Sequence, residues 1–79
     1  MSDIIVKMQE YNTLIERRNK GEKFLDNPSI SIQEKMKHVD RFINLLKQIS
    51  ELQETINTMG YRITDNDLLY GIGKPKGGD

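Results

Sequence analysis

The segment "SIQEKMKHVDRFINLLKQISELQETINTMG", residues 31–60, decides the fold of this 79-residue chain. It opens on a capping box, in which the Ser31 side chain accepts from the Glu34 amide and the Glu34 carboxylate reaches back to Ser31. It closes on Gly60, a residue type that readily adopts the left-handed conformation that ends a helix. The sequence therefore predicts one long helix over about residues 32–59.

Apolar side chains along this helix form two stripes of helical spacing, rotated from each other by about 100°. The first stripe contains Ile32, Met36, Val39, Ile43 and Leu46. The second stripe contains Phe42, Leu45, Ile49, Leu52, Ile56 and Met59. Together they make an apolar face too wide for one neighbouring helix to cover.

An earlier segment carries its own stripe, formed by Ile4, Met8, Tyr11 and Ile15 at spacings of four, three and four. This spacing predicts a first helix over about residues 3–25. The helix should end in "DNPSIS", because a proline disfavours helical geometry in the residue before it. A connection this short predicts an antiparallel two-helix hairpin and an all-α fold.

The register of the hairpin follows from the middle of that connection, near Pro28. Residue numbers of facing pairs should then sum to about 57. The facing pairs predicted in this way are Leu25 with Ile32, Ile15 with Phe42, Tyr11 with Leu46, and Met8 with Ile49.

The remaining residues predict a short fold-back segment. "YRIT" alternates like an extended segment, and "TDND" is a weak capping signal for a turn at "LLY". Tyr61 is placed to pack back on Ile56, and the apolar residues that follow can cover bare parts of the second helix. We expect one helical-hairpin domain over residues 1–73 and a disordered tail over residues 74–79, which is rich in glycine.

Composition excludes several classes of function. The chain has 12 basic and 12 acidic residues, and each third of it is neutral, which disfavours nucleic-acid binding. It has no cysteine, which excludes disulfides and thiol catalysis. No apolar run approaches the roughly 20 residues that span a bilayer, and the N-terminus lacks a signal peptide's apolar core, so we expect a cytoplasmic protein. A chain this short has a thin margin of stability, which favours a partner subunit.

Chemical sites are sparse. His38 follows Glu34 by four residues, which is half of a metal site, but the chain has no second histidine to complete one. No serine has a base beside it in the sequence pattern. We therefore expect no catalytic residues, no metal and no cofactor.

Arg18 lies where the stripe of the first helix should continue, and two interpretations are open. In the first, Arg18 faces Val39 at a hydrated end of the hairpin and pairs with Asp40. In the second, a cluster on the first helix binds an anion such as a phosphate or a nucleotide. Gly21 beside it either lets another backbone approach or weakens the helix by about 1 kcal/mol. The candidate anion-binding residues are Tyr11, Arg17, Arg18, Lys20 and Lys23.

The second stripe of the long helix is the predicted interface. Read as heptads, it places β-branched residues or Phe42 at a and Leu or Met at d, as in a parallel coiled coil. Alternatively, the C-terminal segment covers this stripe within one chain. We predict a non-enzymatic interaction module (an adaptor, inhibitor or structural subunit) that self-associates into a helical bundle or docks on a protein partner through this stripe. Small accessory proteins of phages and mobile elements resemble it in size and composition. The alternative function is capture of a small anionic ligand.

Overall fold

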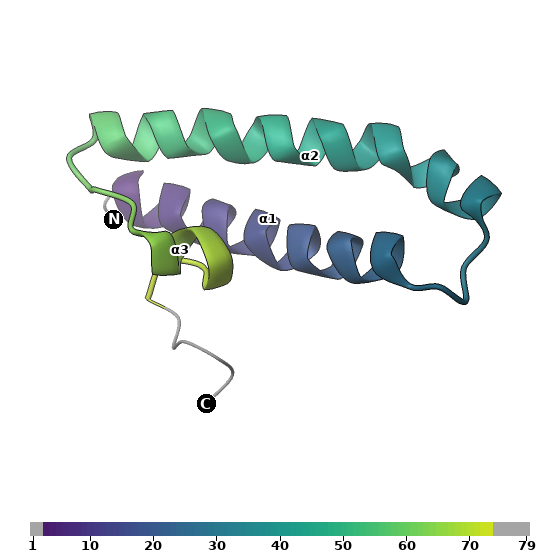
Figure 1. Ribbon diagram of the computed structural model, residues 1–79. Helices are drawn as coiled ribbons and strands as arrows, with labels where there is room; N and C mark the ends of the chain where they lie inside the picture. The colour runs from purple at the N-terminus through teal and green to yellow at the C-terminus, as the bar shows by residue number, and fades with distance from the viewer. Residues whose placement is uncertain (1–2, 74–79) are drawn as a thin grey trace.

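The structure, a computed structural model, describes residues 3–73 and confirms the predicted all-α hairpin (Figure 1). Helix α1 spans Asp3–Asp26, helix α2 spans Ile32–Thr58, and a short helix α3 spans Asp65–Tyr70. The two long helices run antiparallel and differ from their predicted bounds by a single residue at one end each. The tail predicted to be disordered, residues 74–79, lies outside the described residues.

The C-terminal end of α2 has the predicted cap, and its N-terminal end has one half of the predicted capping box. The Glu34 amide donates to the Ser31 hydroxyl at 3.2 Å, while the Glu34 carboxylate pairs with Lys37. At the other end Gly60 has a φ of 108°. There the Tyr61 amide donates to the Ile56 carbonyl at 3.2 Å, and the Gly60 amide donates to Asn57 at 3.0 Å. These two bonds define a Schellman motif and confirm the predicted helix stop.

Helix α3 begins at a complete capping box, which is stronger than the sequence suggested. The Asp67 amide donates to the Thr64 hydroxyl at 3.2 Å, and the Thr64 amide donates to the Asp67 carboxylate at 3.0 Å. The Tyr61 hydroxyl donates to the same carboxylate oxygen at 2.8 Å. Asp67 is buried, so one carboxylate fixes both the start of α3 and the strand-like segment before it.

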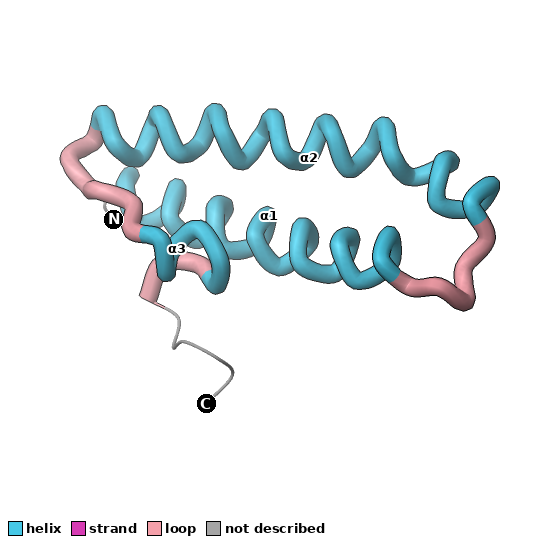
Figure 2. Tube along the Cα trace, viewed as in Figure 1, coloured by secondary structure: helices cyan, strands magenta, loops and turns pink. Residues whose placement is uncertain are grey.

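The core lies where α1, α2 and the C-terminal segment meet. Its fully or almost fully buried apolar side chains come from both long helices: Tyr11, Ile15, Ile49 and Ile56. Partly buried side chains surround them: Leu14, Leu45, Leu52, Tyr61, Ile63 and Ile72. Figure 2 shows the C-terminal segment returning beside α1, so that α3 lies on one face of the hairpin. Helix α3 therefore packs on α1, while Tyr61, Ile63 and Ile72 pack against the core that both long helices share.

The predicted register of the hairpin is wrong. In the structure Gly21 lies against Phe42, Phe24 against His38, and Tyr11 against Gln53. Each of these partners lies about five to seven positions further along α2 than the midpoint of the loop predicts. The reason is that α2 begins beyond the end of α1, so the loop runs along the helix axis before the chain turns back (Figure 1).

At Gly21 the Phe42 ring of α2 packs directly against α1. A Cβ atom at this position would lie 2.8 Å from Cδ1 of the Phe42 ring, so the ring packs where a larger residue would place a side chain. One interpretation of the sequence was that Gly21 lets another backbone approach. In the structure an aromatic ring, that of Phe42, approaches instead.

Gly21→Ala should therefore not increase stability, although alanine favours a helix over glycine by about 1 kcal/mol. Moving the ring costs about 1–3 kcal/mol, as overpacking does in other cores. We expect a net loss of up to about 2 kcal/mol, measured by urea denaturation with the exposed neighbour Lys20→Ala as control. A gain of about 1 kcal/mol for Gly21→Ala would show that the ring moves aside freely.

Candidate interaction surfaces

An apolar stripe on α2 is exposed to solvent along the half of the helix that follows the loop. We call it the outer stripe, and it consists of Ile32, Met36, Val39, Ile43 and Leu46. Ile32 is 75% exposed, Met36 67% and Ile43 55%. The stripe ends after Leu46, because the next two positions at the same helical spacing hold polar residues, Ser50 and Gln53. This is the first stripe of the sequence, and α3 does not reach it because α3 packs on α1.

The stripe predicted to be the interface instead faces the core. Ile49 and Ile56 are buried between the helices, and only Met59 at the end of α2 is largely exposed. The other members of the stripe are half-buried beside them: Phe42, Leu45 and Leu52. The structure thus covers Ile49 and Ile56 within one chain, by α1 together with Tyr61, Ile63 and Ile72. An interface through the buried members would require the hairpin to open.

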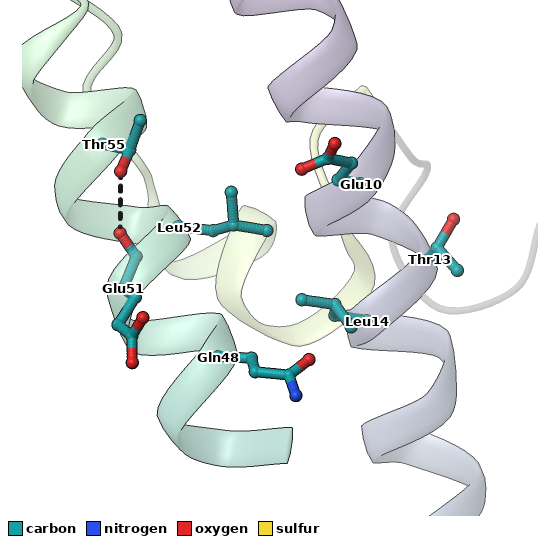
Figure 3. Close-up of a pocket in the computed structure, with 7 residues that line it drawn as sticks. All are labelled: Glu10, Thr13, Leu14, Gln48, Glu51, Leu52 and Thr55. Carbon is teal, nitrogen blue, oxygen red and sulfur yellow. Dashed lines mark hydrogen bonds between the residues drawn. The ribbon is translucent and has the colours of Figure 1, made fainter. Parts of the chain in front are cut away.

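A groove that is open to solvent runs between α1 and α2, and we call it the open groove. Its first part has a volume of about 480 Å³ and contains Leu14 and Leu52 at its floor (Figure 3). Its second part, of about 180 Å³, continues toward the loop. In Figure 3 Leu14 and Leu52 point toward one another from the two helices, and α3 lies behind them. The groove therefore lies on the face of the hairpin that the C-terminal segment leaves uncovered.

Charge is divided along the open groove. The part shown in Figure 3 carries two acids, Glu10 on α1 and Glu51 on α2. The part near the loop carries two bases, Arg17 on α1 and Arg41 on α2, together with His38. Glu10 also contacts Lys7 at 3.6 Å, but both side chains are exposed, so this pair is weak. The groove thus has an acidic half and a basic half on an apolar floor.

The five candidate anion-binding residues point to different sides of α1. Tyr11 is fully buried, Arg17 lines the open groove, and Arg18 lies toward α3. Lys20 and Lys23 are exposed. Successive helical residues are rotated by about 100°, so clustering in sequence does not bring these groups to one point. The structure does not bring the five together as a site.

Arg18 does not pair with Asp40, because the observed register separates them. Its guanidinium contacts the Glu22 carboxylate at 3.6 Å and donates to the Asn19 side chain at 3.1 Å. It also donates to the backbone carbonyl of Leu69 at 3.4 Å, and Asn19 donates to the same carbonyl at 3.1 Å. The polar break in the stripe of α1 is therefore the docking point of α3. The Arg18 side chain is 14% exposed.

Tyr11 joins all three helices through its hydroxyl. The hydroxyl donates to the Asp67 carbonyl at 3.3 Å and accepts from the Gln53 amide at 3.5 Å. Burial raises the pKa of this phenol, so it stays neutral and able to donate at neutral pH. The pKa of Tyr61 is also raised, chiefly by its hydrogen bond to the Asp67 carboxylate. Both tyrosines thus act as structural donors.

Asn12 holds the end of the C-terminal segment, a role that the sequence did not suggest. Its amide donates to the Ile72 carbonyl at 2.9 Å, and the Ile72 amide donates back to its side-chain oxygen at 2.6 Å. The signal was available in principle, because Asn12 is a polar residue beside the buried face of an amphipathic helix. Its partner lies 60 residues away, which local patterns do not reveal.

His38 contacts an aromatic ring rather than a metal-binding group. Its ring lies edge-on to Phe24, with the ring centroids 4.8 Å apart. Within residues 3–73, no group of three or more His, Cys, Asp or Glu side chains is placed to hold a metal ion. Among the helices of the same residues, none is long and apolar enough to cross a membrane.

No protein family, curated protein or solved structure matches this chain.

Proposed function

We propose that this chain is a non-enzymatic interaction module that docks on an apolar helix of another protein through the outer stripe. The observation that carries the proposal is the exposure of five apolar side chains in one continuous row on α2. Single exposed apolar residues are ordinary, whereas a contiguous apolar patch is typical of a binding surface. Such a module acts as an adaptor, an inhibitor or a structural subunit, according to what the bound helix does.

The spacing of the outer stripe supports a helix as the partner. Its members follow one another at intervals of four, three, four and three residues, which is a heptad pattern. Two charged residues, Asp40 and Lys47, flank the stripe on its solvent side. A partner helix with an apolar heptad stripe and charges complementary to these two would fit. Each apolar side chain that the partner fully covers contributes about 1.5–3 kcal/mol, before the entropic cost of association.

Two antiparallel pairings of the outer stripe with a second copy of the chain fit poorly. An antiparallel pairing that brings Asp40 next to Lys47 of the partner subunit would place Met36 opposite the polar residues Ser50 and Gln53. An antiparallel pairing centred on the apolar row does not bring Asp40 next to Lys47 of the partner subunit. Neither of these antiparallel registers satisfies both the apolar row and its flanking charges.

Site-specific photocrosslinking in cells tests the proposal. A benzoylphenylalanine in place of Ile43 should give one discrete crosslinked product, and one in place of Lys37 on the opposite side of α2 should not. With the partner identified and purified, Met36→Gln should weaken its binding about tenfold. The fold should tolerate this change, because Met36 is exposed and surface substitutions alter stability by about 0.5 kcal/mol or less.

Two results would contradict the proposal. One is a product of equal yield from positions 43 and 37, which would show contact without a preferred face. The other is a product that contains only a second copy of this chain, which would make the outer stripe a surface for self-assembly.

A further inference from the structure

From the groove between the long helices we infer that two copies of this chain form an antiparallel dimer, each open groove covered by the other. The four long helices would then make a bundle, with the C-terminal segments on its two outer faces. This inference concerns the face opposite α3 and does not depend on the outer stripe, which remains exposed in such a dimer.

The first argument is that the hairpin is only half covered. The C-terminal segment packs on one face, through Ile63, Ile72 and α3. On the other face the groove floor consists of half-buried apolar side chains that include Leu14, Leu45 and Leu52. Among residues 3–73, only four apolar side chains are buried, which is a small core for a chain of this length. A second layer of helices would complete it.

The second argument is that the charges that α1 contributes to the groove are self-complementary. Glu10 and Arg17 both line the groove from α1 and are seven residues, or about 10 Å, apart along the helix. A two-fold axis that crosses α1 at right angles near Leu14 would bring Glu10 opposite Arg17 of the partner subunit, and the reverse. By the register that sets Tyr11 against Gln53, the same axis passes close to Glu51 on α2, so the complementary pairs are those of α1.

The charges also select the orientation of the two copies. A two-fold axis parallel to the helices would stack the basic half of one groove on the basic half of the other. Like charges in an interface oppose association, and complementary ones fix the register. The antiparallel arrangement, with α1 against α1 and α2 against α2, is therefore the one that the groove favours.

A charge exchange between Glu10 and Arg17 tests both the dimer and its orientation. The wild-type chain should have twice the 9.2 kDa mass of one chain in sedimentation equilibrium at 100 mM salt. Glu10→Arg alone and Arg17→Glu alone each create two pairs of like charges, and each should raise the dimer dissociation constant about tenfold or more. An equimolar mixture of the two variants restores both pairs, so it should form a heterodimer with about the wild-type dissociation constant.

The controls are charge changes of the same kind outside the groove. Glu16→Arg and Arg62→Glu lie on exposed parts of α1 and of the C-terminal segment, and neither should change the mass. Circular dichroism must show the same helix content for all variants, because Glu10 and Arg17 do not contribute to the core.

Three results would overturn the inference. If the wild-type chain keeps the mass of one copy at protein concentrations up to about 1 mM, a second copy does not cover the groove, and any molecule that binds there is a different one. A dimer unaffected by either substitution would place the interface elsewhere. A dimer weakened by both substitutions but not restored in the mixture would contradict the antiparallel orientation.

Discussion

Tyr11→Ala should lower the free energy of unfolding by about 3–5 kcal/mol, the range for removing a large buried aromatic side chain. Tyr11 is fully buried, and its hydroxyl bonds reach both Gln53 on α2 and Asp67 in α3. Its ring therefore supports the contact between the hairpin helices and the docking of the C-terminal segment at once. Small domains have about 5–15 kcal/mol of stability in total, so most of the margin would be lost.

Urea denaturation, followed by far-ultraviolet circular dichroism at one fixed protein concentration, measures this loss. Tyr11→Phe is the matched control, because it keeps the ring and removes only the hydroxyl. It should cost only about 1 kcal/mol, since the Asp67 carbonyl still accepts from the Gly71 amide at 3.0 Å. If Tyr11→Ala costs less than 1 kcal/mol, the three helices do not depend on one another through this side chain.

Periodicity and capping signals were sufficient to predict the helices but not how they face each other. The bounds of α1 and α2, the Schellman motif at Gly60 and the fold-back segment all follow from local patterns. The predicted register was wrong because the length of the loop limits the separation of the two helix ends but does not fix their offset along the helix axis. That offset depends on a non-local fit, the packing of the Phe42 ring against Gly21.

The same distinction explains why the stripe of α2 that was predicted to be the interface packs toward α1. Both stripes have heptad spacing, so the spacing cannot show which of them faces α1. The choice depends on the far end of the chain, where Tyr61, Ile63 and Ile72 close the core over Ile49 and Ile56. Arg18 shows a related limit. The sequence identified it as an anomaly, but its partner, the Leu69 carbonyl, is 51 residues away.

Asp67→Ala should detach the C-terminal segment from the hairpin and lower the free energy of unfolding by about 2–5 kcal/mol. The loss combines a helix cap, about 0.5–2 kcal/mol, with a hydrogen bond to a charged acceptor, about 1.5–3 kcal/mol. Both contributions come from one carboxylate, which accepts from the Thr64 amide and from the Tyr61 hydroxyl. Amide hydrogen exchange should accelerate at Gly71 and Ile72, while the middle of α2 changes less.

Two further variants separate the cap from the tyrosine contact. Tyr61→Phe removes only the hydroxyl bond to Asp67, and Asp67→Asn retains a side-chain oxygen that accepts but carries no charge, so each should cost less than Asp67→Ala. The double variant Asp67→Ala/Tyr61→Phe should lose less stability than the two single losses added together, because the single variants remove the same bond. Strict additivity would mean that Tyr61 and Asp67 act independently.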